Sequence, residues 1–359
     1  MSKVFAAEHT RMLQECIREI ETDPAEYLGA KYMPSIDIPA STVFVDVLEA
    51  RGGLIKEHTL GTDPQATARR QFRTQQYAPG AYKEFIRFNE GDILRLRELG
   101  LNDQSKRGIR QHLNENALVL NNRIESRMEL LRWQSIFNGT YVYDGKTVDF
   151  GKPANHDVSP AIPWGNSVGG SFTTANNAAT PIADLRYWLM GGYAPFRKYK
   201  KTKIIMNPNT ARVFLDNTAV QSLIQNRFAS ESYKMHDINA VVQFLVPGAP
   251  AIEIYEGWYQ SEATDPVTGA ITVGDAIFFI PDGKLYFECK LPDGNKIGDV
   301  VMSLNLSNGS VDAPTAGKFI IVDEKIEENP GNPYIDVIGG FYGGPRLKRA
   351  FDVLTASVI

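Results

Sequence analysis

The stretch QSKRGIRQHLNENALVLNNRIESRMELLRWQSIFN, residues 104–138, contains no proline and a single glycine, Gly108. Its apolar side chains recur three or four positions apart, at Ile109, Leu113, Ala117, Leu120, Ile124, Met128 and Leu131. This spacing places them on one face of an α-helix, which at 1.5 Å per residue would be about 50 Å long. We therefore expect one helix that spans a whole domain. Its remaining surface would carry the charged residues Arg107, Arg110, Glu115, Arg123, Glu125, Arg127, Glu129 and Arg132.

The stretch that follows, FNGTYVYDGKTVDFG at 137–151, comes close to a phosphate-binding loop. Five residues separate Gly139 from the Gly-Lys-Thr triplet at Gly145, whereas such a loop has four. It also needs a strand before it and a helix after it. Here the Asn-Gly pair at Gly139 ends a helix, and Asp144 with Gly145 is typical of a two-residue hairpin turn. We expect a hairpin with a solvated Lys146 and no nucleotide site.

The composition is that of a packed globular protein, with 359 residues, 43% of them hydrophobic and 22% charged. A formal net charge of −4 argues against a dedicated binder of nucleic acid or of an anionic membrane. The two cysteines, Cys16 and Cys289, have no metal-ligand spacing and form no disulfide framework. Since we see no signal-peptide pattern and no membrane-spanning apolar run, we expect a soluble protein made and used in a cytoplasm, with Cys16 a buried thiol.

The N-terminal half predicts long, thin segments. EHTRMLQECIREIE at 8–21 is an amphipathic helix pattern, and Asp23-Pro24 ends it. Residues 41–89 contain two strand patterns with a polar stretch between them, which favours a long two-stranded arm that cannot form its own core. Its stability would come from neighbouring copies. We expect ion pairs between subunits at Arg69, Arg70 and Arg73, and hinges at Gly52, Gly53, Gly61 and Gly80.

The C-terminal half predicts interleaved helices and strands. Residues 151–180 are loop-like, and Thr180-Pro181 opens a helix. Beyond it, helix and strand patterns alternate, which is typical of α/β or α+β folds. The basic and aromatic run FRKYKKTK at 196–203 is a candidate polyanion contact, and a solvated loop before a strand is the reading we favour. The tail RLKRAFDVLTASVI at 346–359 predicts a final strand.

Catalytic motifs are absent from the sequence. The five histidines show no ligand spacing, and no nucleophile elbow or dinucleotide fingerprint occurs. His156 and Asp157 are adjacent, so a base and carboxylate pair of a hydrolase stays open as an alternative. We favour a surface histidine at 156, and we name no catalytic, cofactor-binding or metal-binding residue and no cofactor.

Several stretches, in this order, carry a resemblance to a known family. They are VDFG at 148–151, Trp164, TPIADL at 180–185, MNPNTARVFLDN at 206–217, IYEGWY at 254–259, FFIPDGKLYF at 278–287 and the closing residues 332–359. Together with the N-terminal arm and the long helix, they resemble the major capsid proteins of tailed bacteriophages, and specifically the lambda-type capsid family E. The resemblance covers nearly the whole chain.

The resemblance implies an α+β fold, the tailed-phage major capsid protein fold. Its parts would be an N-terminal arm at 1–41, an extended loop at 42–90, a peripheral domain with the spine helix at 91–178, an axial domain at 179–330, and C-terminal strands at 331–359 that return to the peripheral domain. It implies no enzyme. It implies a subunit of the virion that assembles in the host cytoplasm as hexamers and pentamers into an icosahedral head around double-stranded DNA.

The partners implied are further copies of the chain, portal and scaffold proteins, optional decoration proteins, and packaged DNA in non-specific contact, with no membrane. An encapsulin-like nanocompartment shell of the same fold is the main alternative, and another virion part, such as a tail or decoration protein, is a second. Some relatives link a lysine to an asparagine covalently between subunits. Lys56 and Lys83 lie in the right region, but we predict no cross-link because the sequence reveals no partner for them.

Overall fold

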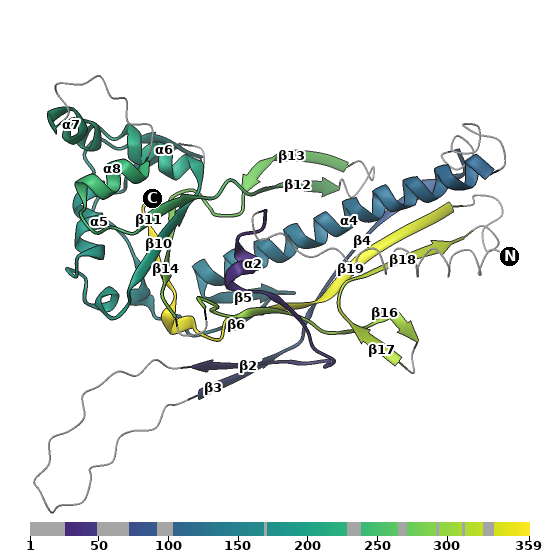
Figure 1. Ribbon diagram of the computed structural model, residues 1–359. Coiled ribbons are helices and arrows are strands. Elements are labelled where there is room, and N and C mark those ends of the chain that lie inside the picture. Colours follow the sequence, from purple (N-terminus) through teal and green to yellow (C-terminus); the bar gives the residue numbers. More distant parts are fainter. Residues whose placement is uncertain are drawn as a thin grey trace, which may run out of the picture.

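Helix α4, Asp103–Asn138, runs through the protein as its longest element (Figure 1). The computed structural model describes residues 26–48, 72–91, 103–168, 171–227, 238–264, 271–291, 294–310, 313–325 and 334–359. The expected long helix is confirmed, and it ends at Gly139, whose φ of 67° is left-handed. Of the expected apolar face, the side chains of Leu113, Ala117, Leu120, Ile124, Met128 and Leu131 are buried. The side chain of Ile109 lies outside the described residues.

The expectation that the rest of α4 is a charged surface is wrong for part of its last four turns. Glu125, Glu129 and Arg132 are buried, as are Trp133 and Ile136. From Glu129 to Phe137 every side chain is buried except that of the exposed Gln134 and that of Leu130, which is half-buried. The buried charges are stabilised by partners that come from distant parts of the chain.

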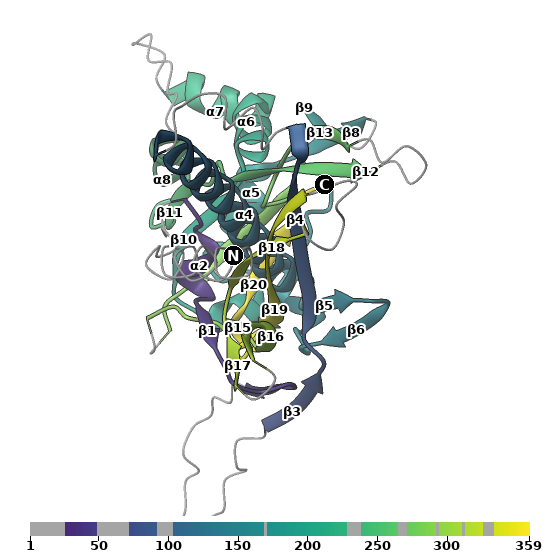
Figure 2. The ribbon, with the colours of Figure 1, turned by 90° about the vertical axis from the view of Figure 1, so that its right-hand side faces the viewer.

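The first sheet lies along α4 (Figures 1 and 2). Its strands run in the order β1-β15-β19-β18, and β4 pairs with the other side of β19. The bounds are β1 Ser35–Asp37, β4 Gly80–Asn89, β15 Asp299–Met302, β18 Phe319–Glu324 and β19 Tyr334–Arg346. Most residues of β19, among them Val337 and Phe341, are buried, so the strand is covered on both faces. Gly339 lets the backbone of β19 approach Leu120 of α4 closely, because a Cβ there would lie 3.1 Å from the leucine Cβ.

The second sheet has the order β11-β10-β14-β20-β7. Its strands are β7 Asp157–Val158, β10 Lys201–Met206, β11 Ala251–Ile254, β14 Lys284–Cys289 and β20 Leu354–Ser357. The helices packed around it are α5 Pro181–Leu189, α6 Pro208–Asp216, α7 Thr218–Arg227 and α8 Ile238–Leu245 (Figure 1). The predicted helix start at Thr180-Pro181 is confirmed, with Pro181 as the first helical residue.

Five two-stranded hairpins complete the described part of the fold. They are β2 Val43–Leu48 with β3 Phe72–Tyr77, β5 Thr140–Tyr143 with β6 Lys146–Asp149, β8 Gly165–Val168 with β9 Ser171–Ala175, β12 Trp258–Thr264 with β13 Ile271–Phe278, and β16 Leu304–Ser310 with β17 Ala313–Ala316. The predicted turn at Asp144 and Gly145 is confirmed by their φ values of 49° and 70°. Residues 151–180 are not entirely loop, since they contain β8 and β9.

The base of the two-stranded arm packs within its own subunit, whereas the sequence predicted that the arm would depend on neighbouring copies. The strands β2 and β3 pair and project from the body, as the sequence predicts (Figures 1 and 2). However, Val43, Val45 and Val47 are buried within the same chain. The following strand β4 joins the first sheet along ten residues of β19. The arm is therefore rooted in its own subunit, and the expected N-terminal helix at 8–21 lies outside the described residues.

The two sheets draw strands from distant parts of the chain. The first combines β1, β4, β15 and β18 with β19, and the second combines β7 near residue 157 with β20 near the C-terminus. Of the closing residues 331–359, β19 lies in the sheet along α4, whereas β20 lies in the sheet surrounded by α5 to α8. Divisions drawn at single positions along the sequence therefore cut across both sheets. Among the described helices, none is long and apolar enough to cross a membrane.

Two short 3₁₀ helices link these parts around the second sheet. Helix η1, Ala154–His156, precedes β7, and helix η2, Ala194–Lys198, precedes β10. A third, η3, Ala350–Asp352, connects β19 to β20. The C-terminal strand β20 forms ladder pairs with both β14 and β7.

Candidate assembly surface

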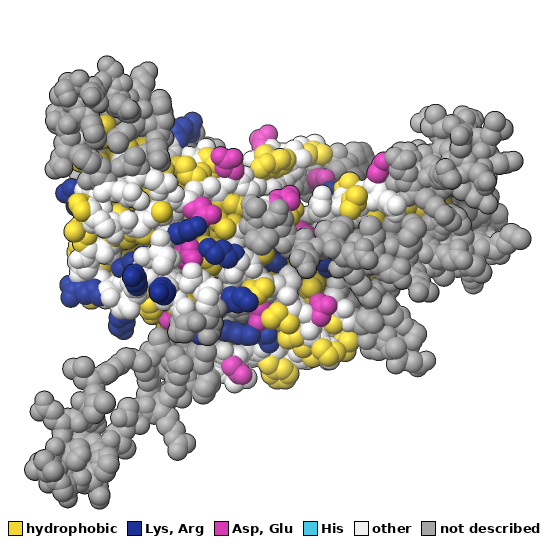
Figure 3. All heavy atoms as spheres, in the orientation of Figure 1, with side chains coloured by type: hydrophobic (Ala, Val, Ile, Leu, Met, Phe, Trp, Pro, Cys, Tyr) yellow, Lys and Arg dark blue, Asp and Glu magenta, His cyan; other side chains and the backbone are white. Residues whose placement is uncertain are grey.

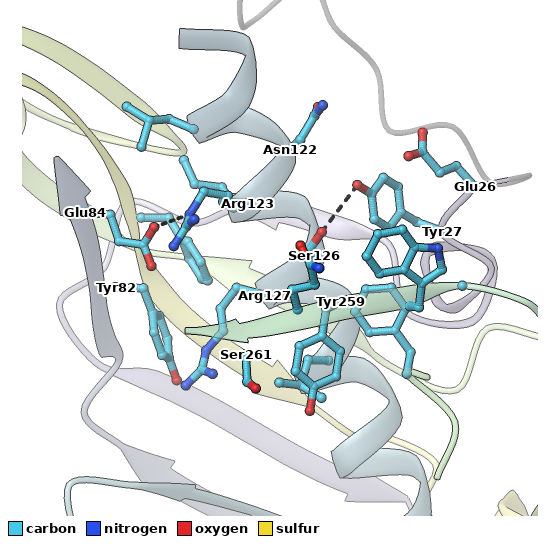
Figure 4. A pocket seen from close by; sticks show the side chains of 18 of the residues that line it. Glu26, Tyr27, Tyr82, Glu84, Asn122, Arg123, Ser126, Arg127, Tyr259 and Ser261 are labelled. Carbon is cyan, nitrogen blue, oxygen red and sulfur yellow. Dashed lines mark hydrogen bonds and ion pairs between the residues drawn. The ribbon is translucent and has the colours of Figure 1, made fainter. Parts of the chain in front are cut away.

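A groove of about 1270 Å³ opens above α4 (Figure 4). Its floor is the exposed side of α4 around Asn122, Ser126 and Arg127. Strand β4 forms one wall, strands β11 and β12 form another, and the segment Glu26–Leu28 closes one end. Elements from four separate regions of the sequence therefore meet here.

Arg123 holds two walls of the groove together. Its Nε donates to Glu84 Oε2 of β4 at 2.5 Å, and its two Nη atoms donate to both carboxylate oxygens of Glu262 of β12, at 2.7 and 2.9 Å. The fork geometry of a guanidinium suits a bidentate carboxylate. These hydrogen bonds lower the pKa of Glu262 and raise that of Arg123. The β12–β13 hairpin is thereby fixed over the helix.

Aromatic side chains line the groove. The guanidinium of Arg127 lies 4.9 Å from the ring centroid of Tyr82, in cation–π geometry. Tyr259 stacks on Phe279 with 5.5 Å between ring centroids. The ring of Trp258, at the mouth, is 54% exposed. Aromatic groups and arginine with partial exposure are the composition expected of a protein interface before its partner binds.

A buried polar cluster supports the floor from below. Glu129 Oε1 accepts hydrogen bonds from Gly29 N and Trp133 Nε1, each at 2.7 Å, and from the hydroxyl of Tyr255 at 3.0 Å. Its Oε2 accepts from Arg132 Nη1 at 3.1 Å. The contact with Glu129 and burial raise the pKa of the Tyr255 hydroxyl, with burial the larger cause.

Arg132 extends the same cluster to the start of the described chain. Its Nε donates to the carbonyl of Met33 at 2.9 Å and its Nη2 donates to Ser35 Oγ at 2.8 Å. Helix α2, Gly29–Tyr32, and strand β1 are thus anchored on α4. This cluster was not predicted from the sequence, in which the charges of Glu129 and Arg132 next to the apolar Leu131 and Trp133 were the available signal.

The proposed hydrolase pair does not form. Asp157 Oδ1 accepts from the Thr355 hydroxyl at 2.9 Å, and Oδ2 lies 3.7 Å from Lys284 Nζ. His156 packs edge-on against the ring of Tyr199. Our expectation of a surface histidine is also wrong, because His156 is only 6% exposed, and burial lowers its pKa. His156 and Asp157 therefore have separate partners, Tyr199 for the imidazole and Thr355 for the carboxylate.

The remaining candidates are placed as follows. Lys146 is exposed on β6, and its hairpin lies after a helix, so no phosphate loop forms. Cys289 is a buried free thiol whose pKa burial raises to about 12. In the part of the chain that the structure describes, no group of three His, Cys, Asp or Glu side chains could hold a metal ion. Cys16, Lys56, Arg69 and Arg70 lie outside the described residues.

Two candidate residues of the extended region, Lys83 and Gly80, lie in its described part. The ammonium of Lys83 lies 4.8 Å from the ring centroid of Tyr342 and 5.6 Å from that of Phe319. Gly80 is buried, and a Cβ there would lie 2.4 Å from the Tyr141 hydroxyl. This glycine therefore allows close packing of β4, a role distinct from the hinge we expected. The other three expected hinges, Gly52, Gly53 and Gly61, lie outside the described residues.

The family model described as phage major capsid protein E matches residues 9–290. The chain belongs to this capsid family. As a family member it is a shell-forming component of the phage virion. The family match favours neither the nanocompartment nor the hydrolase alternative, since the family is structural.

One solved structure supports the fold of this capsid protein, and two capsid structures are similar at lower scores. A prophage protein of Escherichia coli CFT073 assigned as a capsid protein is 14% identical, with a TM-score of 0.56, and the match covers 98% of this chain and 99% of the other. The capsid of a native GTA particle is 12% identical, with a TM-score of 0.45 and coverage of 94% and 91%. The capsid of Ralstonia phage GP4 is 11% identical, with a TM-score of 0.41 and coverage of 94% and 92%. Curated protein sequences contain no match.

Proposed function

We propose that this capsid protein assembles as hexamers and pentamers into an icosahedral head that encloses double-stranded DNA of a tailed phage. Assembly takes place in the host cytoplasm with portal and scaffold proteins, and with decoration proteins where the phage has them. The protein acts as a structural subunit and not as an enzyme. The proposal extends the family membership, which rests on the match over residues 9–290.

The observation that carries this proposal is the open groove above α4. The groove has a partly exposed aromatic lining, and an arm projects from the same subunit (Figures 1 and 4). The single chain thus has both an open groove and a projecting arm. A contact between the arm of one copy and the groove of the next is head-to-tail, and such contacts close into rings and shells. We propose that the groove of one copy receives the β2–β3 arm, the projecting part of the extended loop, of its neighbour.

The two sheets indicate which segments of the chain belong to each domain. We propose that α4 with the sheet of β4, β15, β18 and β19 forms the peripheral domain. The sheet of β10, β11, β14 and β20 with helices α5 to α8 would form the axial domain. This division departs from the expected ranges 91–178 and 179–330, because β15 and β18 of the second range join the peripheral sheet and β7 of the first range joins the axial sheet. The segment 1–41 would form the N-terminal arm.

The experiment fills the groove. Asn122 is exposed on its floor, so the substitution Asn122→Trp should leave the free energy of unfolding within about 0.5 kcal/mol of wild type. We expect the yield of closed shells, counted by electron microscopy after expression with the neighbouring gene products, to fall at least about tenfold, the effect of 1.4 kcal/mol per contact. The control Ser222→Trp places the same bulk on exposed α7. Normal shells from Asn122→Trp would refute the role of the groove.

A further inference from the structure

Helix η2 and the start of β10 carry a concentration of positive charge. Residues 194–203 contain the five basic residues Arg197, Lys198, Lys200, Lys201 and Lys203 and no acidic residue. This density is unexpected in a chain with a net charge of −4. Figure 3 shows several Lys and Arg side chains on the left and central parts of the described surface.

Lys290, the residue after strand β14, adds a fourth cation to three of these side chains. The amide of Lys290 donates to the carbonyl of Lys200 at 2.9 Å, so the two residues are neighbours although far apart in sequence. Arg197, Lys198, Lys200 and Lys290 are all exposed. We call these four residues the basic patch. The sequence alone could not show it as a patch, because Lys290 reaches it only through the sheet.

The four side chains of the basic patch lack carboxylate partners, unlike several other described arginines. Arg87, Arg123 and Arg346 each form close ion pairs with Asp or Glu. Among the described residues, no carboxylate lies within ion-pair distance of the four patch side chains. Lys203, at the end of the same run, is excluded from the patch because it pairs with Glu253 at 2.7 Å. Four exposed cations without counter-charges produce a local positive potential that would attract a polyanion.

The backbone beneath the basic patch is held in place. Phe196 is fully buried, with its ring centroid 5.3 Å from that of Phe287. The hydroxyl of Tyr199 donates to the carbonyl of Phe351 at 2.7 Å, and Arg197 Nε donates to the carbonyl of Gly191. The charges are therefore presented from a fixed surface, which lowers the cost of ordering them on a ligand.

We propose that the basic patch contacts the phosphate backbone of double-stranded DNA, so that this face of the subunit points into the shell. This inference rests on the proposed function, in which the shell encloses DNA. Within the described parts of 194–203 and 284–296 no large hydrophobic side chain is exposed, and the exposed Tyr187 and Met190 lie outside these ranges, at the end of α5. A protein partner would be expected to need such an apolar centre, whereas phosphate binding relies on released counterions and needs only cations.

The expected affinity is modest and depends strongly on salt. Each neutralised phosphate contributes a slope of about −0.9 to log K against log salt, so four contacts predict a slope between about −3 and −4. A single subunit would bind weakly. The repetition of the basic patch over the inner surface of a shell would multiply that weak binding, while each individual contact stays reversible enough for DNA to leave.

The test uses full-length subunits before shell assembly and a short fluorescent DNA duplex, with anisotropy measured between about 50 and 200 mM salt. The variant Lys200→Gln with Lys290→Gln should lower affinity by about tenfold at the lower salt and reduce the slope by about two. The matched control, Lys146→Gln with Arg212→Gln, removes two exposed charges elsewhere and should change affinity less than twofold. Equal effects of the two variants, or no effect of either, would overturn the proposal.

Two further measurements separate the explanations. Poly-glutamate of similar charge serves as an acidic protein, and binding as tight as that of the duplex would show that the basic patch accepts an acidic partner and would refute the DNA assignment. Shell formation by each variant is counted in parallel by electron microscopy. If wild type forms no shells, the proposed function fails. If shells form normally but the substitutions in the basic patch leave the affinity for DNA unchanged, only the present inference fails.

Discussion

Glu129 is fully buried on α4, with one carboxylate oxygen shared among Gly29, Trp133 and Tyr255. A buried ion pair such as Glu129 with Arg132 is weak evidence of net stabilisation, because desolvation opposes the attraction. Removing one partner, however, leaves the other charge buried and alone. The residue is therefore better understood as an anchor that selects one position of the N-terminal segment on α4.

We predict that Glu129→Ala lowers the free energy of unfolding by about 3–5 kcal/mol, because Arg132 loses its counter-charge in a buried site. Urea unfolding of unassembled subunits measures the effect. Glu115→Ala on the exposed side of the same helix is the control and should stay within about 0.5 kcal/mol of wild type. Equal stabilities of the two variants would contradict the anchoring role.

Gly343 illustrates a residue whose importance comes from backbone contact. It lies on β19 opposite Met302 of β15, and a Cβ at this position would lie 2.0 Å from the carbonyl oxygen of Val301. Because that neighbour is backbone, it cannot rotate away. The glycine is required by the close approach of two strands and not by its φ angle.

We predict that Gly343→Ala destabilises the protein by about 1–3 kcal/mol, since the sheet must shift to admit the methyl group. Gly91→Ala is the control, because a Cβ at Gly91 meets nothing within 4 Å. Thermal unfolding of both variants gives the comparison. A Gly343→Ala protein as stable as the Gly91→Ala protein would disprove the close approach.

At the C-terminal end of α4, the side chain of Lys152 caps the last carbonyl groups of the helix. Lys152 Nζ donates to the carbonyls of Ile136 and Phe137, at 3.2 and 2.8 Å, and to the Thr355 hydroxyl at 2.6 Å. The last carbonyls of a helix otherwise lack donors. Burial lowers the pKa of Lys152 to about 8, and the carboxylate of Asp157 partly offsets this.

This pKa predicts a pH dependence with a defined sign. Between about pH 8 and pH 10 the unfolded chain keeps the Lys152 proton while the folded chain releases it, so the contribution of Lys152 to stability rises with pH. We predict that the stability difference between wild type and Lys152→Met shifts in favour of wild type by up to about 3 kcal/mol over this window. Lys146→Met, an exposed control, should show a constant difference. A flat difference for Lys152→Met would contradict the burial of the charge.

At the scale of the whole molecule, buried tyrosines dominate the alkaline response. Burial is the main cause of the raised pKa of eight hydroxyls, those of Tyr27, Tyr32, Tyr77, Tyr82, Tyr141, Tyr199, Tyr255 and Tyr286. These side chains lie in both sheets and around α4. Together they outweigh the single lysine discussed above.

We predict that the unassembled subunit loses stability as pH rises above about 10. Below that pH the tyrosines are protonated in both states, and above it only unfolded tyrosines ionise, so the unfolded state is favoured. The midpoint of urea unfolding, measured from about pH 9 to about pH 11, should fall steadily. Tyrosinate absorbance should appear together with unfolding. Ionisation of most tyrosines in a protein that stays folded would contradict this prediction.

The local sequence determined those elements whose signals lie within a few residues. The 3.6-residue spacing from Leu113 to Leu131 predicted α4, Asp144-Gly145 predicted the β5–β6 turn, and Pro181 predicted the start of α5. These signals work because helix periodicity and positive φ angles are properties of short segments. The order of such segments also carried the family resemblance, which the match over residues 9–290 confirms.

Contacts between distant segments could not be read in this way, and they decided the burial and the candidate surfaces. Glu129 and His156 were expected at the surface and are buried, because partners about a hundred or more residues away enclose them. Arg123 joins β4 to β12, and Lys290 meets Lys200, only after the sheets have formed. Side-chain burial and charge clustering depend on which strands pair, and strand pairing depends on packing over the whole chain, which no local pattern contains.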